Sequence, residues 1–268
     1  MRRLDVAFSP LGLGPPDVQG RTVFVLDILR ATTAMCAALH HGARALIPVA
    51  STEEALRLAQ TIGSADVLLA GEKDCARIPG FALGNSPLEM TEQTVRGKTL
   101  IVTTTNGTKA LLAAQGAATV YVAAAVNLTV AGERARQALE EHRDVLILCA
   151  GREAAFALDD AYGAGRLAVA ALGGRKPRRG LNDAAIASLD LVRRYGDNWA
   201  RPLSYSRAGR ELARLGFGSD VLDAARMDAY PVLPQFHERR VTTAQPTPVP
   251  PPVVPQPQLH PQPQPQPS

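Results

Sequence analysis

Carboxylates and basic side chains stand at the ends of several apolar segments of this chain, and such groups together bind cations and phosphate esters. The carboxylates are Asp27, Glu72 and Asp160, and the neighbouring basic residues are Arg30, Lys73 and Arg152. Burying Asp27 at the end of an apolar run is costly unless the carboxylate is paired or binds a cation. Two interpretations follow: an ion pair between Asp27 and Arg30, or an oxygen-ligand site for Mg²⁺ and a phosphate ester.

The segment TTTNGT at 103–108 adds small donors to this set. Asn106-Gly107 is a strong hairpin signal, but residues 109–115 are strong helix formers, so the sequence predicts a strand, a polar loop and a helix. The start of such a helix presents free N–H groups and a partial positive charge, which suit an anion. We therefore predict anion contacts from two loops, with Thr32 and Thr33 in the first and Thr105, Asn106, Gly107 and Thr108 in the second.

The elements that must position these groups follow from the alternation of apolar and polar segments. Strands are predicted within 20–27, 42–49, 66–70, 97–102, 116–122 and 143–151, and helices at 31–39, 52–61, 110–115 and 158–172. Repeated strand–loop–helix units of this kind favour a three-layer α/β/α fold with a largely parallel or mixed sheet. Because such sheets bind ligands beyond the carboxyl ends of their strands, the loops that follow the strands are where we expect the site.

Composition excludes several classes of function. With 268 residues, 46% of them hydrophobic, the chain can bury a sizeable core. A net charge of +4 would suit nucleic acid, but the basic residues are scattered apart from a cluster at 175–179, and aromatics make up only 4%. The three cysteines form no CxxC motif, and no signal peptide or membrane-spanning apolar run is present. We predict a cytoplasmic protein that binds neither nucleic acid nor membrane.

The chain divides into two parts of different composition. Residues 1–240 are predicted to form one α/β domain, with two similar subdomains and a break near 125–143 as the alternative. Residues 241–268 are rich in proline and glutamine, and we expect them to be disordered or in polyproline II conformation. This tail is either dispensable or a ligand for a module that reads polyproline II. A homo-oligomer is left open.

Common catalytic signatures are absent. The sequence has no GxxxxGK[ST], no GxGxxG after a strand, no HExxH and no GxSxG. Leu29 stands where a phosphoryl-accepting Asp-x-Asp motif would need its second aspartate. Direct attack by water is therefore the preferred mechanism, and an aspartyl-phosphate at Asp27 is the alternative.

Segments at the predicted strand ends resemble, in order and spacing, the motifs of the 2-phosphosulfolactate phosphatase family. They are VLDILRATTAMCAALHHGA, LLAGEKDCARIPGFALGNSP, IVTTTNGTKAL and CAGREAAFALDDAYGAG, with a further block at 204–235. TTTNGT and GFALGNSP are the most specific strings, and the resemblance extends from the first predicted strand to Gln235. It implies a Mg²⁺-dependent hydrolase that releases phosphate from (2R)-phosphosulfolactate to give sulfolactate, an early step in coenzyme M biosynthesis.

The resemblance also assigns site residues. It implies catalytic and metal-binding roles for Asp27, Glu72 and Asp160, and substrate contacts from Arg30, Thr32, Thr33, Lys73, Asn85, Ser86, Thr105, Asn106, Gly107, Thr108, Gly151 and Arg152. Two positions depart from the family pattern: Lys73, where arginine is usual, cannot form a bidentate fork, and Ala208 stands where histidine is frequent. Both bear on sulfonate specificity. A phosphatase for another small phosphorylated hydroxy-acid, or a non-catalytic anion-binding protein with a partner-recruiting tail, are the alternatives.

Overall fold

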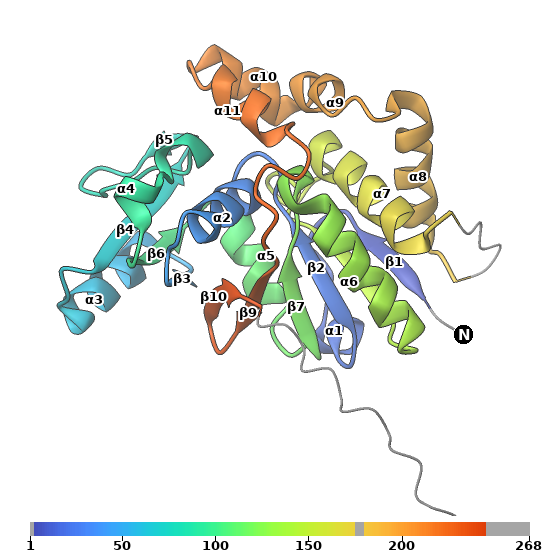
Figure 1. Ribbon diagram of the computed structural model, residues 1–268, viewed down its shortest axis with the longest axis horizontal. Helices are drawn as coiled ribbons and strands as arrows, with labels where there is room; N and C mark the ends of the chain where they lie inside the picture. Colours follow the sequence, from blue (N-terminus) through green and yellow to red (C-terminus); the bar gives the residue numbers. More distant parts are fainter. Residues whose placement is uncertain (1–2, 175–179, 245–268) are drawn as a thin grey trace, which may run out of the picture.

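The computed structural model describes residues 3–174 and 180–244. Through them runs one 10-stranded sheet in the order β1-β8-β2-β7-β9-β10-β3-β6-β4-β5, flanked by helices (Figure 1). The strands are β1 (Leu4–Ala7), β2 (Thr22–Leu26), β3 (Ala45–Pro48), β4 (Val67–Lys73), β5 (Ala76–Arg77), β6 (Thr99–Thr103), β7 (Thr119–Val122), β8 (Val145–Cys149), β9 (Pro234–His237) and β10 (Arg240–Thr243). The predicted α/β fold with a largely parallel, mixed sheet is confirmed.

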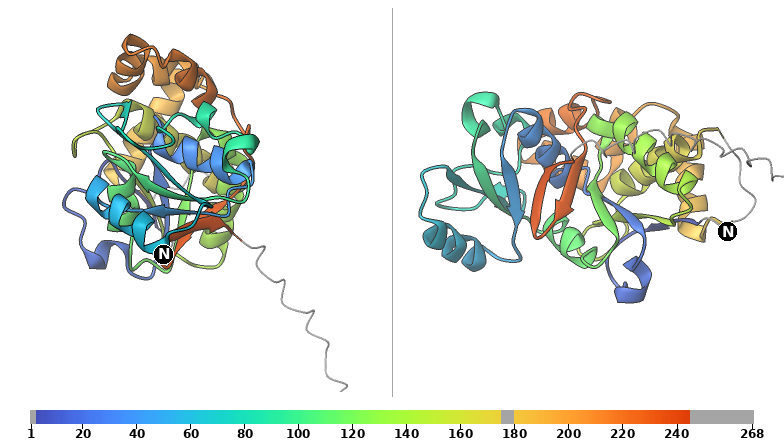
Figure 2. Two further views of the ribbon diagram at one scale, coloured as in Figure 1. Left: turned by 90° about the vertical axis from the view of Figure 1, so that its left-hand side faces the viewer. Right: turned by 60° about the horizontal axis from the view of Figure 1, so that its bottom comes forward.

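Helices follow most of the parallel strands and cover the sheet. The α-helices are α1 (Pro15–Val18), α2 (Ala31–His40), α3 (Thr52–Ile62), α4 (Glu92–Val95), α5 (Gly107–Ala113), α6 (Leu128–Glu140), α7 (Leu158–Leu172), α8 (Asp183–Tyr195), α9 (Ala200–Tyr205), α10 (Arg207–Arg214) and α11 (Gly218–Ala224). Two short 3₁₀ helices are η1 (Pro87–Glu89) and η2 (Ala125–Asn127). Figure 2 shows helices on both sides of the sheet.

The sheet consists of two parallel blocks joined by an antiparallel hairpin. Strands β1, β8, β2 and β7 form one block, and β3, β6 and β4 form the other. The hairpin β9–β10 lies between them, pairing with β7 on one side and β3 on the other. The chain crosses between the blocks twice, through α2 from β2 to β3 and through α5 from β6 to β7. These crossings bring the loops after β2 and β6 to the same edge of the sheet.

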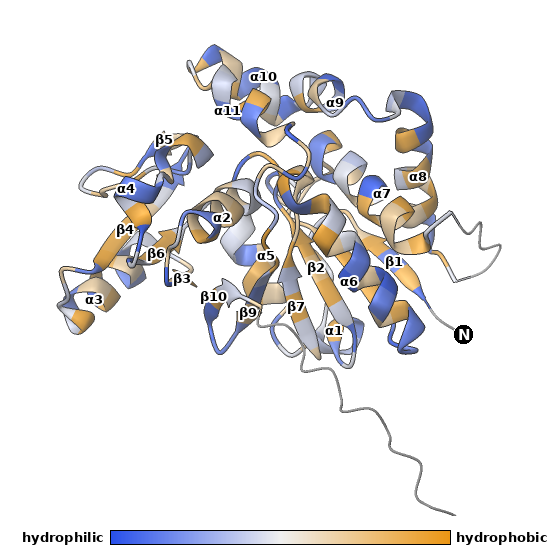
Figure 3. Ribbon diagram, viewed as in Figure 1, coloured by the Kyte–Doolittle hydropathy of each residue, from blue (hydrophilic) through white to orange (hydrophobic). Residues whose placement is uncertain are grey.

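Burial explains the central strands. Every residue of β2 and β8 is buried, as expected for parallel strands covered on both faces. Figure 3 shows hydrophobic residues concentrated on the strands and polar residues on the outer faces of the helices. Helices α9, α10 and α11 lie across the edge where β2 ends (Figure 1). In the part of the chain that the structure describes, no helix is both long and apolar enough to cross a membrane.

Two predicted boundaries shift. Strand β4 extends to Lys73 and pairs with β5, so Glu72 lies in a hairpin and not in a loop after the strand. Strand β10 includes residues 241–243, which the sequence-based boundary assigned to the tail, and Val241 is fully buried. The remaining tail, 245–268, and the basic cluster 175–179 lie outside the described residues. The division near 125–143 stays a prediction.

Candidate active site

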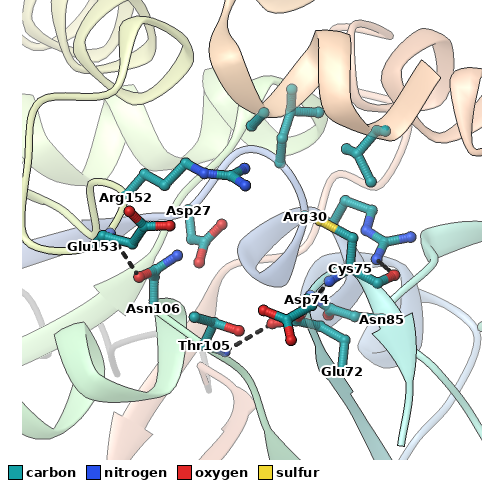
Figure 4. A pocket seen from close by; sticks show the side chains of 13 residues that line it. Asp27, Arg30, Glu72, Asp74, Cys75, Asn85, Thr105, Asn106, Arg152 and Glu153 are labelled. Atoms are coloured by element: carbon teal, nitrogen blue, oxygen red, sulfur yellow. Dashed lines mark hydrogen bonds between the residues drawn. The ribbon is translucent and has the colours of Figure 1, made fainter. Parts of the chain in front are cut away.

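A pocket with about 540 Å³ of empty space opens at the edge of the sheet where β2, β6 and β8 end (Figure 4). Its lining comes from the loops after these strands, the β4–β5 hairpin, the segment before η1 and helix α10: Asp27, Leu29, Arg30, Glu72, Asp74, Cys75, Asn85, Thr105, Asn106, Arg152, Glu153, Ala208 and Leu212. The loops that the sequence singled out therefore meet in one pocket. Helix α10 covers the pocket; from this helix the sequence singled out only Ala208, as a departure from the family pattern, and assigned no substrate contact to it.

The loop after β2 is folded around Asp27 by the two threonines that begin α2. Thr32 Oγ1 accepts a hydrogen bond from the Asp27 N–H at 3.1 Å and donates to the Asp27 carbonyl at 2.9 Å. Thr33 Oγ1 donates to the Ile28 carbonyl at 2.8 Å. Both hydroxyls are buried and outside the pocket lining. Thr32 and Thr33 thus hold the backbone that presents Asp27.

Two glycines allow the loops to approach closely. A Cβ on Gly107 would lie 2.5 Å from Ala31 Cβ and 2.7 Å from Asp27 Oδ2. Gly151 has a φ of +64°, and a Cβ there would lie 2.4 Å from the Ala155 carbonyl oxygen. Gly107 therefore leaves room for the Asp27 carboxylate, and Gly151 makes the turn after β8 possible.

The carboxylates in this region repel one another in a buried setting. Burial raises the pKa of Asp27 to about 7, and the charges of Asp159 and Glu72 add to the effect. Burial likewise raises the pKa of Asp159 to about 6. The pKa of Asp160 lies well above its ordinary value because of burial and the neighbouring Asp159. Deprotonating these three carboxyl groups at neutral pH therefore costs free energy unless positive charge is brought to them.

Asp160 and Asp159, neighbours in the first turn of α7, have different surroundings. Asp160 accepts hydrogen bonds from the Ile28 N–H at 2.9 Å and the Gly151 N–H at 3.0 Å, so it ties together the loops after β2 and β8. Asp159 Oδ1 is buried without a hydrogen-bond partner among the described residues. It lines a second pocket together with Arg152. Consecutive side chains of a helix point in different directions. The sequence Asp159-Asp160 therefore predicted an acidic residue at this position but not which of the two faces the site.

Glu72 joins two of the converging segments. Its carboxylate accepts from the Thr105 N–H at 2.7 Å and from the Cys75 N–H at 2.9 Å (Figure 4). Lys73 is exposed and outside the pocket lining, because successive side chains of a strand alternate between its faces. Asp74 and Cys75 form the hairpin turn, with φ values of +53° and +66°. Asp74 adds a carboxylate to the pocket that the sequence reasoning did not find.

Arg30 is held by three groups. Its guanidinium donates to Asp220 Oδ2 at 2.7 Å and to the Cys75 carbonyl at 2.7 Å. It also lies over the Phe217 ring, 4.7 Å from the centroid. The side chains of Arg30 and Asp220 are only 3% and 2% exposed. The ion pair therefore anchors α11 to the loop after β2.

Asp220, a residue that sequence reasoning missed, also connects the segment before η1. Ser86 Oγ donates to Asp220 Oδ1 at 2.7 Å, so Ser86 supports the pair from outside the pocket lining, whereas Asn85 is in the lining. The ion pair of Arg30 is made with Asp220, and the proposed pair with Asp27 is not found among the described residues. A buried arginine signals the need for a partner, but the partner is 190 residues away in the chain.

Of the loop after β6, Thr105 and Asn106 line the pocket, whereas Thr108 does not. Thr108 Oγ1 donates to the Thr104 carbonyl at 3.0 Å, and the Thr108 N–H donates to Thr104 Oγ1 at 3.1 Å. Thr108 is thus buried in its own loop. Thr105 and Asn106 line the pocket, and Asn106 Oδ1 accepts from the Glu153 N–H at 3.3 Å. In Figure 4 the Asp27 and Arg152 side chains point into the same space, while the Arg30 guanidinium turns toward Cys75.

The donors of the pocket suit a hard cation. Carboxylate oxygens of Asp27 and Glu72, together with the unpaired Oδ1 of Asp159 in the second pocket, are the ligand type that Mg²⁺ takes in proteins. Across 3–174 and 180–244, no three acidic, histidine or cysteine side chains stand close enough together to make a ready metal cluster. The residues therefore fit Mg²⁺ by the chemistry of their donors and by their need for positive charge.

A pocket lined by acids and arginines lies at the ends of the parallel strands, where α/β folds bind small ligands, and its charges suit a phosphate ester that arrives with a cation. The comparisons with known proteins agree. A family profile described as 2-phosphosulpholactate phosphatase matches residues 11–239. The chain belongs to the 2-phosphosulfolactate phosphatase family, and is thus a phosphoric monoester hydrolase.

Three relatives show how far the likeness extends, each named a probable 2-phosphosulfolactate phosphatase. The protein of Symbiobacterium thermophilum is 39% identical over 85% of this chain and 97% of its own length. That of Carboxydothermus hydrogenoformans is 37% identical over 88% of this chain and 93% of its own. That of Deinococcus radiodurans is 40% identical, covering 82% and 87%. The profile match over residues 11–239 includes every residue of the pocket lining.

Proposed function

We propose that this protein is a Mg²⁺-dependent phosphatase that hydrolyses (2R)-phosphosulfolactate to sulfolactate and phosphate. The observation that carries the proposal is the buried carboxylate of Asp27, which faces Arg152 and borders the acids Asp159 and Glu72. Carboxylates alone would repel a polyanionic ester. Beside arginines they suit an ester that arrives with a cation.

Asp27, Glu72 and Asp159 are the residues that would hold Mg²⁺. Asp159 takes the place of Asp160 in this assignment, because its Oδ1 is buried without a hydrogen-bond partner among the described residues and it lines the second pocket, whereas Asp160 lines neither pocket. Bound there, Mg²⁺ would neutralise phosphoryl oxygens and lower the pKa of a water molecule.

The chain's own groups orient the ester. Arg152 brings positive charge to the phosphoryl oxygens from the β8 side, and Thr105 and Asn106 line the pocket from the loop after β6. Two nitrogens of the Arg30 guanidinium are committed to Asp220 and to the Cys75 carbonyl, so Arg30 supplies fixed charge from a rigid position. Direct attack of water on phosphorus is the preferred mechanism, with an aspartyl-phosphate at Asp27 as the alternative.

Phosphate release tests the proposal directly. Purified protein is assayed with phosphosulfolactate, phospholactate and 3-phosphoglycerate, in Mg²⁺ and in EDTA, beside Asp27→Asn. Mg²⁺-dependent release that is fastest with phosphosulfolactate and lost in Asp27→Asn is the expected result. Equal rates on all three esters would replace it with a broader hydroxy-acid phosphatase. Absence of release from every ester would favour an anion-binding protein.

The two mechanisms are separated by acid quenching. A reaction with ³²P-labelled ester is stopped within one turnover, and the protein is precipitated. Direct attack by water leaves no label on the chain, whereas an aspartyl-phosphate leaves label that Asp27→Asn abolishes.

A further inference from the structure

A second pocket adjoins the first along the start of α10. It contains about 570 Å³ of empty space and is lined by the loop after β8, the first turn of α7 and the α9–α10 junction. Arg152 and Ala208 line both pockets. Arg152 and the small Ala208 side chain therefore stand where the two pockets adjoin.

Arginines dominate the charge of the second pocket. Arg152, Arg207 and Arg210 line it, and the single carboxylate in the lining, Asp159, is only 3% exposed. The Arg210 guanidinium donates to the Tyr205 carbonyl. A ligand in this pocket thus meets mainly cationic donors.

Two of these guanidinium groups have donors to spare. Arg152 Nε is buried without a hydrogen-bond partner among the described residues. Arg207 lies 3.7 Å from Glu153, and the two side chains are 68% and 61% exposed. An exposed pair at such a distance contributes little and is easily exchanged for a better acceptor. A buried unmatched N–H is costly, so the pocket favours an anion that would accept from it.

We propose that the second pocket binds a second anionic group of the substrate, a sulfonate or a carboxylate, while the phosphate lies in the first. This inference rests on the proposed function and extends it. Arg152 lies between the two anions, and Arg207, at the start of α10, binds the second one. Substrates would then be small phosphate esters that carry another strong anion on a neighbouring carbon, and esters without one would be bound at the phosphate alone.

The test uses one arginine of the pocket and a matched control on the same helix. Arg207→Gln removes a pocket charge from an exposed position, so the fold should be retained. Arg214→Gln removes the same charge from α10 at a residue that pairs with Glu211 and lines neither pocket. Values of kcat/KM are measured in Mg²⁺ for wild type and both variants.

Four esters locate the anion. Phosphosulfolactate carries both groups, phospholactate only the carboxylate, the phosphate ester of 2-hydroxypropanesulfonate only the sulfonate, and isopropyl phosphate neither. We expect Arg207→Gln to lower kcat/KM about tenfold for the esters whose anion occupies the pocket, and to leave isopropyl phosphate almost unchanged. If phospholactate loses activity, the pocket binds the carboxylate; if the 2-hydroxypropanesulfonate ester loses activity, it binds the sulfonate. Equal loss on all four esters, or loss on none, would overturn the proposal.

Binding of sulfolactate separates this inference from the proposed function. Sulfolactate has no phosphate, so its Kd, measured by calorimetry, needs no turnover. If wild type releases no phosphate from any ester, the proposed reaction fails, and this Kd still decides the pocket. A Kd about tenfold weaker in Arg207→Gln and unchanged in Arg214→Gln supports it. Absence of binding, or equal Kd in all three proteins, overturns it.

Discussion

At the scale of single residues, the buried carboxylates that suit a cation also lower the stability of the fold when no cation is bound. Burial and mutual repulsion raise the pKa of Asp27 to about 7 and burial raises that of Asp159 to about 6. In the unfolded chain both would titrate near 3.8. The native state therefore holds more protons than the unfolded state between about pH 4 and pH 7, so stability without a cation falls as pH rises through this window.

The first prediction follows from this sign. Without Mg²⁺, the wild type should melt at a higher temperature at pH 5 than at pH 7.5, and Asp27→Asn should raise Tm at pH 7.5 by about 3 °C or more because it removes the repelling charge. Thermal melts in EDTA measure both. Asp190→Asn, an equal change in an exposed ion pair, is the control. A lower Tm for Asp27→Asn would contradict the prediction.

The second prediction concerns the buried pair of Arg30 and Asp220. Asp220→Ala leaves a buried guanidinium without its partner, which we expect to cost about 3 kcal/mol of the free energy of unfolding. Urea unfolding measures this cost. Asp190→Ala breaks an exposed pair and should cost less than about 0.5 kcal/mol. Equal costs in the two variants would show that the buried pair does not anchor α11.

At the scale of elements, the site depends on helices α2 and α5 starting close together. Gly107 begins α5 and lies against the first residue of α2, with no space for a Cβ beside the Asp27 carboxylate. The loops after β2 and β6 come from different parallel blocks, so this contact aligns the two halves of the pocket.

The third prediction tests that contact. Gly107→Ala should lower kcat for the preferred ester at least about tenfold, because the new methyl group displaces Asp27. Gly218→Ala is the matched control, since a Cβ at Gly218 meets no atom within 4 Å. Steady-state kinetics of both variants decide the matter, and normal kcat in Gly107→Ala would mean that the loop can adjust freely.

At the scale of the whole molecule, the C-terminal hairpin joins the two parallel blocks. Val241 in β10 pairs with Phe236 in β9 and with Leu46 in β3, and it is fully buried. The hairpin β9–β10 thus bridges the first block, after whose strand β2 Asp27 lies, and the second, which contains Glu72. Stability of the sheet and assembly of the site are therefore linked through residues far from the pocket.

The fourth prediction measures this link. Val241→Ala should lower the free energy of unfolding by about 2 kcal/mol, because a buried side chain is truncated between two strands. Thr242→Ala, at the exposed next residue, should change it by less than about 0.5 kcal/mol. Urea unfolding compares them. A stable Val241→Ala protein would indicate that the blocks hold together without the hairpin.

The sequence by itself determined the local elements and the groups available for chemistry. The apolar runs before Asp27 and TTTNGT are strands, and the segments after them are helices, because short-range periodicity governs backbone conformation. Asp27, Glu72, Asn106 and Arg152 were predicted for one site and meet in one pocket, because parallel strands end at a common edge. The C-terminal strands were missed: β9 contains a proline, and the strand-favouring residues of β10 were assigned to the proline- and glutamine-rich tail that follows them.

Only the tertiary structure decided which partners meet across the chain. It pairs Arg30 with Asp220 and not with Asp27, it leaves Asp159 Oδ1 without a partner and uses Asp160 as a support, and it places α10 over a second pocket. No sequence pattern contains these choices, because each depends on packing between segments that are distant in the chain. Local propensity acts over a few residues, whereas burial, pairing and pocket shape are properties of the assembled molecule.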